Sequence, residues 1–130
     1  HHSDFFSKGI LLSPSVWTTL ADDNFIYTSQ HAFSNGTTSW SWDLYKQLFP
    51  TQYIGEVDPS QVSFFVATTS DDGVVPVADV DAFVEQLKNA GINVDYQRDS
   101  GDNHNWKYWS RVAPTAYAWA LEQFKSADSK

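Results

Sequence analysis

The sequence predicts an α/β fold in which parallel strands are joined by crossover helices, and three consecutive segments support this prediction. Residues 62–69 are rich in β-branched and aromatic residues, as is typical of a buried strand. From Val77 the apolar residues recur at helical spacing, with an apolar stripe of Val80, Phe83, Val84 and Leu87. Gly91 suits the end of this helix, and residues 92–98 then alternate as a strand does. A strand, a helix and a strand within about forty residues form a βαβ unit, whose strands are parallel.

Two further elements flank this unit. The short apolar run at 9–13, closed by Pro14, predicts another strand buried on both faces. An aromatic stretch leads into a terminal helix over about residues 109–125, whose buried stripe is expected to be Val112, Ala116, Trp119 or Ala120, and Phe124. Because a proline inside a helix costs about 3 kcal/mol, Pro114 is tolerable in this helix only if the regular helix begins near it.

Residues 18–61 differ in character from the rest. Their sequence predicts a turn at 35–38 and a short amphipathic helix around 42–48, and we expect these residues to form a lid-like excursion from the sheet. Internal repeats and linkers are absent from the sequence. Residues 1–130 are therefore predicted to belong to a single domain.

Composition excludes several kinds of chemistry. The formal net charge of −8 argues against nucleic acid, because phosphate contacts draw on clustered basic side chains. No apolar run approaches the roughly 20 residues that cross a bilayer, and residues 1–6 do not form a signal peptide, so no membrane partner is predicted. The absence of cysteine excludes disulfides, thiolate metal sites and cysteine nucleophiles. No cofactor is predicted, and chemistry is expected to depend on hydroxyls, carboxylates and histidine.

Candidate site residues follow two of the predicted strands. Asp71 and Asp72 come after the strand at 62–69, and His104 comes after the next strand, 32 residues beyond Asp72. In an open parallel sheet, ligands bind beyond the carboxyl ends of the strands. A carboxylate followed by a histidine in this order could orient and stabilise an imidazole that accepts a proton. In the alternative interpretation the aspartates cap the helix at Val77 and His104 is an ordinary loop residue. These three residues lack a short-range metal-ligand motif, so no metal site is predicted.

Three segments resemble one family. Residues 5–17, the Asp-Asp-Gly-Val-Val-Pro segment at 71–76 and the Gly-Asp-Asn-His-Asn-Trp-Lys-Tyr-Trp segment at 101–109 resemble C-terminal blocks of an esterase family of α/β-hydrolases. This family includes feruloyl and acetyl-xylan esterases, S-formylglutathione hydrolases and mycolyltransferases. The resemblance implies a serine-type carboxylic ester hydrolase that acts through an acyl-enzyme, with His104 as general base and Asp72 as the acid. Asp71 stays open as the alternative acid.

One departure from that family concerns the nucleophile. The sequence contains no Gly-x-Ser-x-Gly, the strained elbow that exposes the serine of an α/β-hydrolase. We therefore expect the chain to be the C-terminal half of the fold, with the serine in a missing N-terminal part. An N-terminal segment or second chain is then the expected partner that completes the sheet. Ser13 and Ser15, beside Pro14, are interpreted as turn residues.

The expected substrate is a small-molecule or carbohydrate-linked ester. Trp106 follows the histidine closely and Trp40 lies in the excursion, so both are candidates for substrate binding. Packing in the core is the competing interpretation for each. The alternative function, favoured by the missing elbow, is a non-catalytic module that binds a carbohydrate or a protein on a hydrolase scaffold.

Overall fold

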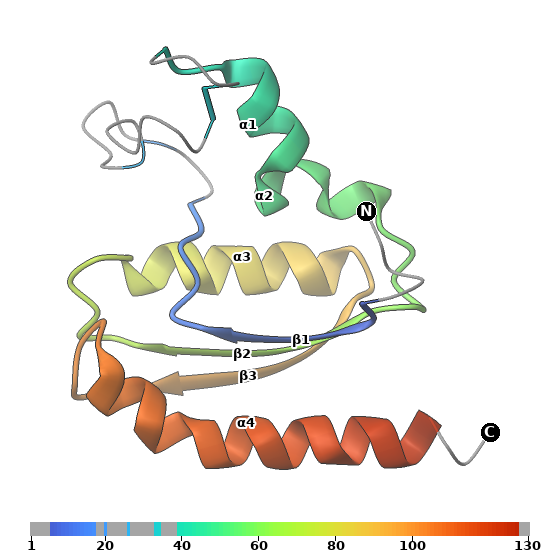
Figure 1. Cartoon of the computed structure of the whole chain (residues 1–130), viewed down its shortest axis with the longest axis vertical. Helices are drawn as coiled ribbons and strands as arrows, with labels where there is room; N and C mark the ends of the chain where they lie inside the picture. Colours follow the sequence, from blue (N-terminus) through green and yellow to red (C-terminus); the bar gives the residue numbers. More distant parts are fainter. Residues whose placement is uncertain (1–5, 18–19, 21–25, 27–32, 35–38, 128–130) are drawn as a thin grey trace.

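The described part of the chain is built around a parallel sheet that has helices packed on both faces. The computed structural model describes residues 6–17, 20, 26, 33–34 and 39–127. In this part of the chain the strands are β1 (Lys8–Leu12), β2 (Ser63–Thr69) and β3 (Asn93–Asp99), arranged in the order β1-β2-β3. Helix α3 (Val77–Asn89) covers one face and α4 (Trp106–Ala127) covers the other (Figure 1). The predicted α/β class with parallel strands is confirmed.

Strand β2 lies at the centre of the sheet, and its side chains alternate between the two faces. Val66 belongs to the core that contains Phe83 and Leu87 of α3. Phe65 and Ala67 belong to the second core, which they share with α4. Almost every residue of β2 is buried, as expected for a strand covered on both faces.

Helix α3 has the stripe that its sequence predicted, because Val80, Phe83, Val84 and Leu87 are all buried. The helix ends at Asn89, and Gly91 follows with a φ of +80°, which a glycine adopts without steric cost. Its N–H donates to the carbonyl of Lys88, which is one of the terminal carbonyls of the helix. The chain then turns directly into β3.

Helix α4 departs from its prediction in two ways. It begins at Trp106, close to the predicted start at about residue 109, but it continues through Pro114, so the condition that the regular helix begins near the proline is not met. Pro114 lies on the exposed side of the helix, and Ser110, whose carbonyl loses its helical partner, is exposed as well, so water can hydrate that carbonyl. The second departure is Phe124, which is 62% exposed and does not contribute to the buried stripe. The buried positions are Tyr108, Val112, Ala116 and Trp119.

The excursion contains the short helix predicted for it. Helix α1 spans Trp42–Leu48 and begins after Ser41, whose side chain accepts a hydrogen bond from Leu44 N–H. Two elements that the sequence did not indicate follow, α2 (Pro50–Tyr53) and the 3₁₀ turn η2 (Ile54–Glu56). Buried Tyr45, Phe49 and Ile54 join this region to the α3 side of the core. The predicted turn at 35–38 lies outside the described residues.

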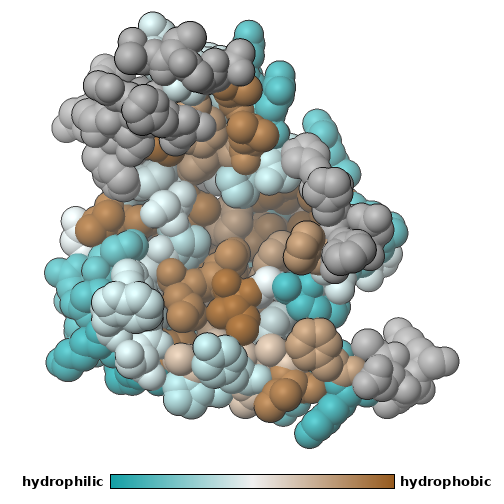
Figure 2. Space-filling model, viewed as in Figure 1, coloured by the Kyte–Doolittle hydropathy of each residue, from teal (hydrophilic) through white to brown (hydrophobic). Residues whose placement is uncertain are grey.

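Strand β1 lies at one edge of the sheet in the described part of the chain. Its residues are half-buried or exposed, so the expected burial on both faces is not present. Apolar side chains gather near the middle of the face seen in Figure 2, in the region of β1 in Figure 1. A cavity of about 450 Å³ lies between this strand, α3 and the α2–η2 segment, and Leu11, Phe64 and Phe83 are among its lining residues. None of the described helices is long and apolar enough to cross a bilayer.

Candidate active site

The carboxylate of Asp72 is buried and firmly held. The residue follows the carboxyl end of β2, and its side chain has no exposed surface. Its Oδ1 accepts hydrogen bonds from the backbone N–H groups of Val74 and Val75, each at 2.9 Å. Burial by itself raises the pKa of Asp72, but these two N–H groups and the contact with His104 outweigh burial and hold the pKa below the usual 3.8. Asp72 is therefore ionised at neutral pH.

His104 lies in the loop that follows β3, and its Nδ1 is 2.9 Å from Oδ2 of Asp72. An ionised carboxylate can only accept a hydrogen bond, so Nδ1 must carry the proton. In the neutral imidazole Nε2 is then unprotonated, and it is free to take a proton from a hydroxyl group. No described residue hydrogen-bonds to Nε2, and the side chain is 21% exposed. The structure thus brings together the two residues that the loop positions predicted to meet.

Asp71, the other candidate acid, has a different set of contacts. Its Oδ2 accepts the N–H of Gly101 at 2.5 Å, and no contact joins it to His104 in the described structure. Thr69 donates its hydroxyl proton to the carbonyl of Gly101 at 2.8 Å. Asp71 and Thr69 therefore tether the loop after β2 to the loop after β3. This arrangement favours Asp72 over Asp71 as the partner of the histidine.

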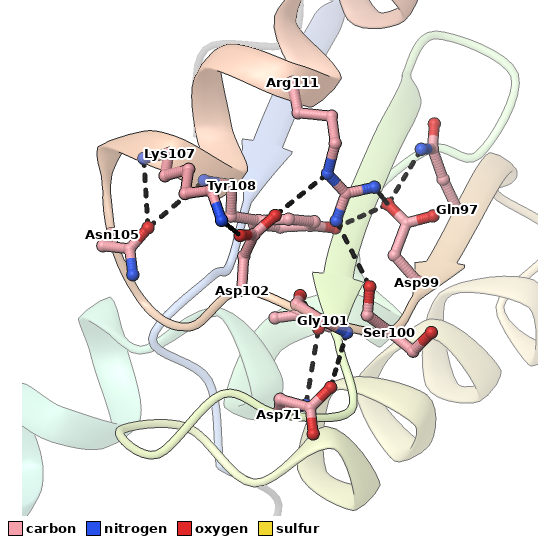
Figure 3. A network of polar contacts seen from close by, with 11 residues as sticks. Asp71, Gln97, Asp99, Ser100, Gly101, Asp102, Asn105, Lys107, Tyr108 and Arg111 are labelled. Carbon is pink, nitrogen blue, oxygen red and sulfur yellow. Dashed lines mark hydrogen bonds and ion pairs between the residues drawn. The ribbon is translucent and has the colours of Figure 1, made fainter.

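A polar network joins the histidine loop to the start of α4 (Figure 3). The Nε of Arg111 lies 3.1 Å from Oδ2 of Asp102, and Lys107 Nζ lies 2.6 Å from the other oxygen of the same carboxylate. The buried Tyr108 donates its hydroxyl proton to Asp99 at 3.2 Å. Burial and the Asp99 carboxylate both raise the pKa of the Tyr108 phenol, so it stays protonated as a donor. The loop is thereby anchored to α4 by charged and buried groups.

One tryptophan of α4 lies beside the imidazole, and a second packs against the first. The ring of Trp109 meets His104 edge to face at a centroid distance of 5.2 Å, and Trp106 packs against Trp109 in the same manner. Trp106 is 78% exposed, so most of its surface is available to another molecule. Substrate binding by Trp106 stays a prediction, now with a defined place on the rim of the site.

Trp40, the other predicted substrate-binding residue, lies in an aromatic cluster of the excursion. Its ring packs against Phe33, Trp42 and Tyr45, with centroid distances between 5.3 and 5.5 Å. It is also packed against the core on the α3 side. These contacts agree with the interpretation of Trp40 as a packing residue, and no ring contact between Trp40 and His104 is present in the described structure.

Ser13 combines features that can suggest a nucleophile, but its neighbour argues against that role. It follows β1, its φ is +47°, and its buried hydroxyl has no partner among the described residues. In the nucleophile elbow, the residue after the serine donates its N–H to the oxyanion. Pro14 occupies that position and has no N–H to donate. The interpretation of Ser13 as a turn residue is therefore retained.

The described residues do not bring together three or more histidine, aspartate or glutamate side chains at a potential metal site.

One residue of the site is not evident from the sequence. Asn103 lies among the turn formers of its loop, yet its Oδ1 contacts both loops of the site. Asparagine is common in turns, so its position beside the histidine gave no signal of this role.

Comparison with known families decides the class of this site. The chain matches the model of the prolyl oligopeptidase family over residues 1–127. The chain belongs to the prolyl oligopeptidase family. It is accordingly a serine hydrolase of the α/β-hydrolase superfamily, the superfamily that the resemblance of the three sequence segments implied. The match supports the superfamily but not the esterase family that the three sequence segments resemble. No curated protein matches the chain.

Proposed function

We propose that this chain supplies the acid and the base of a serine hydrolase that cleaves its substrate through an acyl-enzyme. The observation that carries the proposal is the 2.9 Å contact between Nδ1 of His104 and the buried, ionised carboxylate of Asp72. Nε2 takes the hydroxyl proton of the nucleophilic serine while the serine oxygen attacks the substrate carbonyl. Asp72 stabilises the imidazolium, which then protonates the leaving group. In the second half of the reaction, a water molecule gives its proton to Nε2 and attacks the acyl-enzyme, which releases the carboxylic acid product and restores the serine hydroxyl.

The proposed substrate class is a peptide bond, because family membership is the strongest constraint on the substrate. Ester hydrolysis, predicted from the three sequence segments, is the second candidate. The same acyl-enzyme mechanism cleaves both bonds, and an amide has the poorer leaving group. The ratio of kcat/KM for a peptide p-nitroanilide and for a p-nitrophenyl ester with the same acyl group separates the two. Cleavage of the ester alone would overturn the peptidase assignment.

The nucleophile is proposed to lie in a segment that precedes His1 in the full-length protein. The 130 residues contain no Gly-x-Ser-x-Gly, and Ser13 is followed by a proline. Strand β1 has a free edge in the described part of the chain, beside half-buried apolar residues. A further strand that pairs with β1 would cover this edge and bring a serine to the same end of the sheet.

Two substitutions at the acid and base test the proposal in the full-length protein. His104→Ala removes the base, and Asp72→Asn replaces the acceptor of Nδ1–H by an amide that favours the wrong tautomer. Each is expected to lower kcat by about 10⁴-fold. Asp71→Asn is the matched control, because this carboxylate does not contact the histidine, and it should retain at least about a tenth of the activity. Near-normal turnover by His104→Ala would refute the proposal.

The competing function is a binding module without catalysis. It is favoured by the missing elbow and by Trp42, which is half exposed beside Trp40 and offers a ring on which a sugar can stack. A fluorophosphonate that labels activated serines distinguishes the two functions. Labelling of the full-length protein that is abolished by His104→Ala supports the hydrolase, and absence of labelling in the unsubstituted protein supports the binding module.

A further inference from the structure

One more side chain contacts both loops that carry the proposed acid and base. The Oδ1 atom of Asn103 accepts the backbone N–H of Gly73 at 2.8 Å and the backbone N–H of His104 at 2.7 Å. Gly73 directly follows Asp72, so a single oxygen joins the residue after the acid to the residue that carries the base. Both partners are N–H donors, and the atom between them must therefore be the amide oxygen of Asn103.

Other contacts between these loops act farther from the imidazole. Asp71 and Thr69 bind the N–H and the carbonyl of Gly101, three residues before the histidine. The network around Arg111 and Asp102 holds the loop to α4 rather than to the loop of the acid (Figure 3). Among the described residues, Asn103 is the side chain that binds the peptide N–H of His104 itself.

We infer that Asn103 is a positioning residue that sets the distance between the acid and the base. The inference rests on the proposed function of Asp72 and His104. The His104 side chain is partly exposed, and its described side-chain contacts are the one carboxylate and the ring of Trp109. The position of its backbone therefore has a direct effect on whether Nδ1 reaches Asp72. Misplacement of a reacting group by about 1 Å can lower a rate by about 100-fold.

An amide suits this position because it supplies an acceptor without a charge. A carboxylate would keep both hydrogen bonds, since its oxygens also accept N–H groups. It would, however, place a negative charge next to His104 and favour the protonated imidazole. Asn103 thus holds His104 in place without favouring its protonated form, which cannot act as a base.

Asn103→Ala in the full-length protein is the first test. With both hydrogen bonds lost, kcat is expected to fall by about 100-fold while KM changes by less than about twofold. Asn105→Ala is the matched control. Asn105 also accepts two backbone N–H groups through Oδ1, but these belong to Lys107 and Tyr108 at the start of α4. Asn105→Ala should lower the melting temperature by about as much as Asn103→Ala does, but it should reduce kcat by less than about tenfold.

Asn103→Asp provides a readout that a purely structural role would not change. It should restore most of kcat at alkaline pH, because both N–H groups regain an acceptor. The acidic limb of its pH–rate profile should move to higher pH, because the added charge favours protonated His104. A restored rate with an unshifted acidic limb would contradict the inferred proximity of this side chain to the base.

A spectroscopic measurement separates failure of this inference from failure of the proposed function. The proton between Nδ1 of His104 and Asp72 gives a low-field NMR signal that is assigned by its loss in His104→Ala. Asn103→Ala should shift or broaden this signal, and Asn105→Ala should not. If His104→Ala is fully active, the proposed function fails, whatever Asn103 does. If His104→Ala is inactive but Asn103→Ala keeps both normal kcat and the unshifted signal, the positioning role alone is refuted.

Discussion

Arg111 and Asp102 join the first turns of α4 to the loop that carries His104. The Nε of Arg111 lies 3.1 Å from Asp102 Oδ2, and its Nη2 donates to the carbonyl of Ser100 at 3.3 Å. The guanidinium also lies over the ring of the buried Tyr108, at 5.2 Å from the centroid. Arg111 therefore holds the loop through an ion pair and a backbone carbonyl, while its contact with the ring of Tyr108 lies within α4.

Arg111→Ala is expected to lower stability only slightly. The arginine is about half exposed, and exposed ion pairs contribute less than about 1 kcal/mol. The free energy of unfolding, measured in urea, should fall by roughly this amount, and less at high salt because salt screens the pair. Lys88→Ala is a suitable control, since its pair with Glu85 on α3 lies away from the loop. If the free energy of unfolding falls by more than about 3 kcal/mol, the Arg111–Asp102 pair behaves as a buried ion pair.

Asp72 should make stability depend on pH in a defined direction. Burial raises its pKa, but the N–H groups of Val75 and Val74 and the contact with His104 hold the folded-state pKa below 3.8. A carboxyl group with a lowered folded-state pKa stabilises the fold fully above its unfolded-state pKa. This contribution is lost as the pH falls through the lowered value. The free energy of unfolding should therefore decrease below about pH 4 more steeply in the unsubstituted protein than in Asp72→Asn. If the free energies of unfolding of the two proteins fall in parallel between about pH 5 and about pH 2, this expectation is contradicted.

The sequence predicted those features that depend on short-range periodicity and on strand order. The stripe of α3 and the meeting of Asp72 with His104 follow from these two rules. Pro114 was misjudged because its cost depends on whether the carbonyl of Ser110 reaches water, which periodicity does not show. Phe124 was misjudged because α4, with 22 residues, is about 33 Å long, whereas a strand of seven residues is about 23 Å long. The last turns of α4 therefore extend beyond the sheet (Figure 1).

Gly9→Ala should destabilise the sheet through a steric conflict with Phe64. The two residues are paired across β1 and β2, and a Cβ at Gly9 would lie 2.6 Å from a ring carbon of Phe64. The ring must move to admit the methyl group, and such overpacking typically costs about 1–3 kcal/mol. Gly55→Ala is the matched control, because nothing lies within 4 Å of a Cβ there. Its effect should be neutral or slightly stabilising. Equal losses of unfolding free energy in the two variants would show that the close approach to Phe64 has no energetic consequence.

The edge of β1 allows a test of the proposed additional strand by hydrogen exchange. In the described part of the chain β1 pairs with β2 alone, and its register places Ile10 opposite Phe65 and Leu12 opposite Ala67. Backbone N–H groups alternate in direction along a strand, so a strand paired on one side protects only every second amide. If another strand pairs with β1 in the full-length protein, every amide from Lys8 to Leu12 should exchange slowly. Slow exchange at alternate positions only would show that β1 is a true edge, and the nucleophile would then have to reach His104 from a segment that does not extend this sheet.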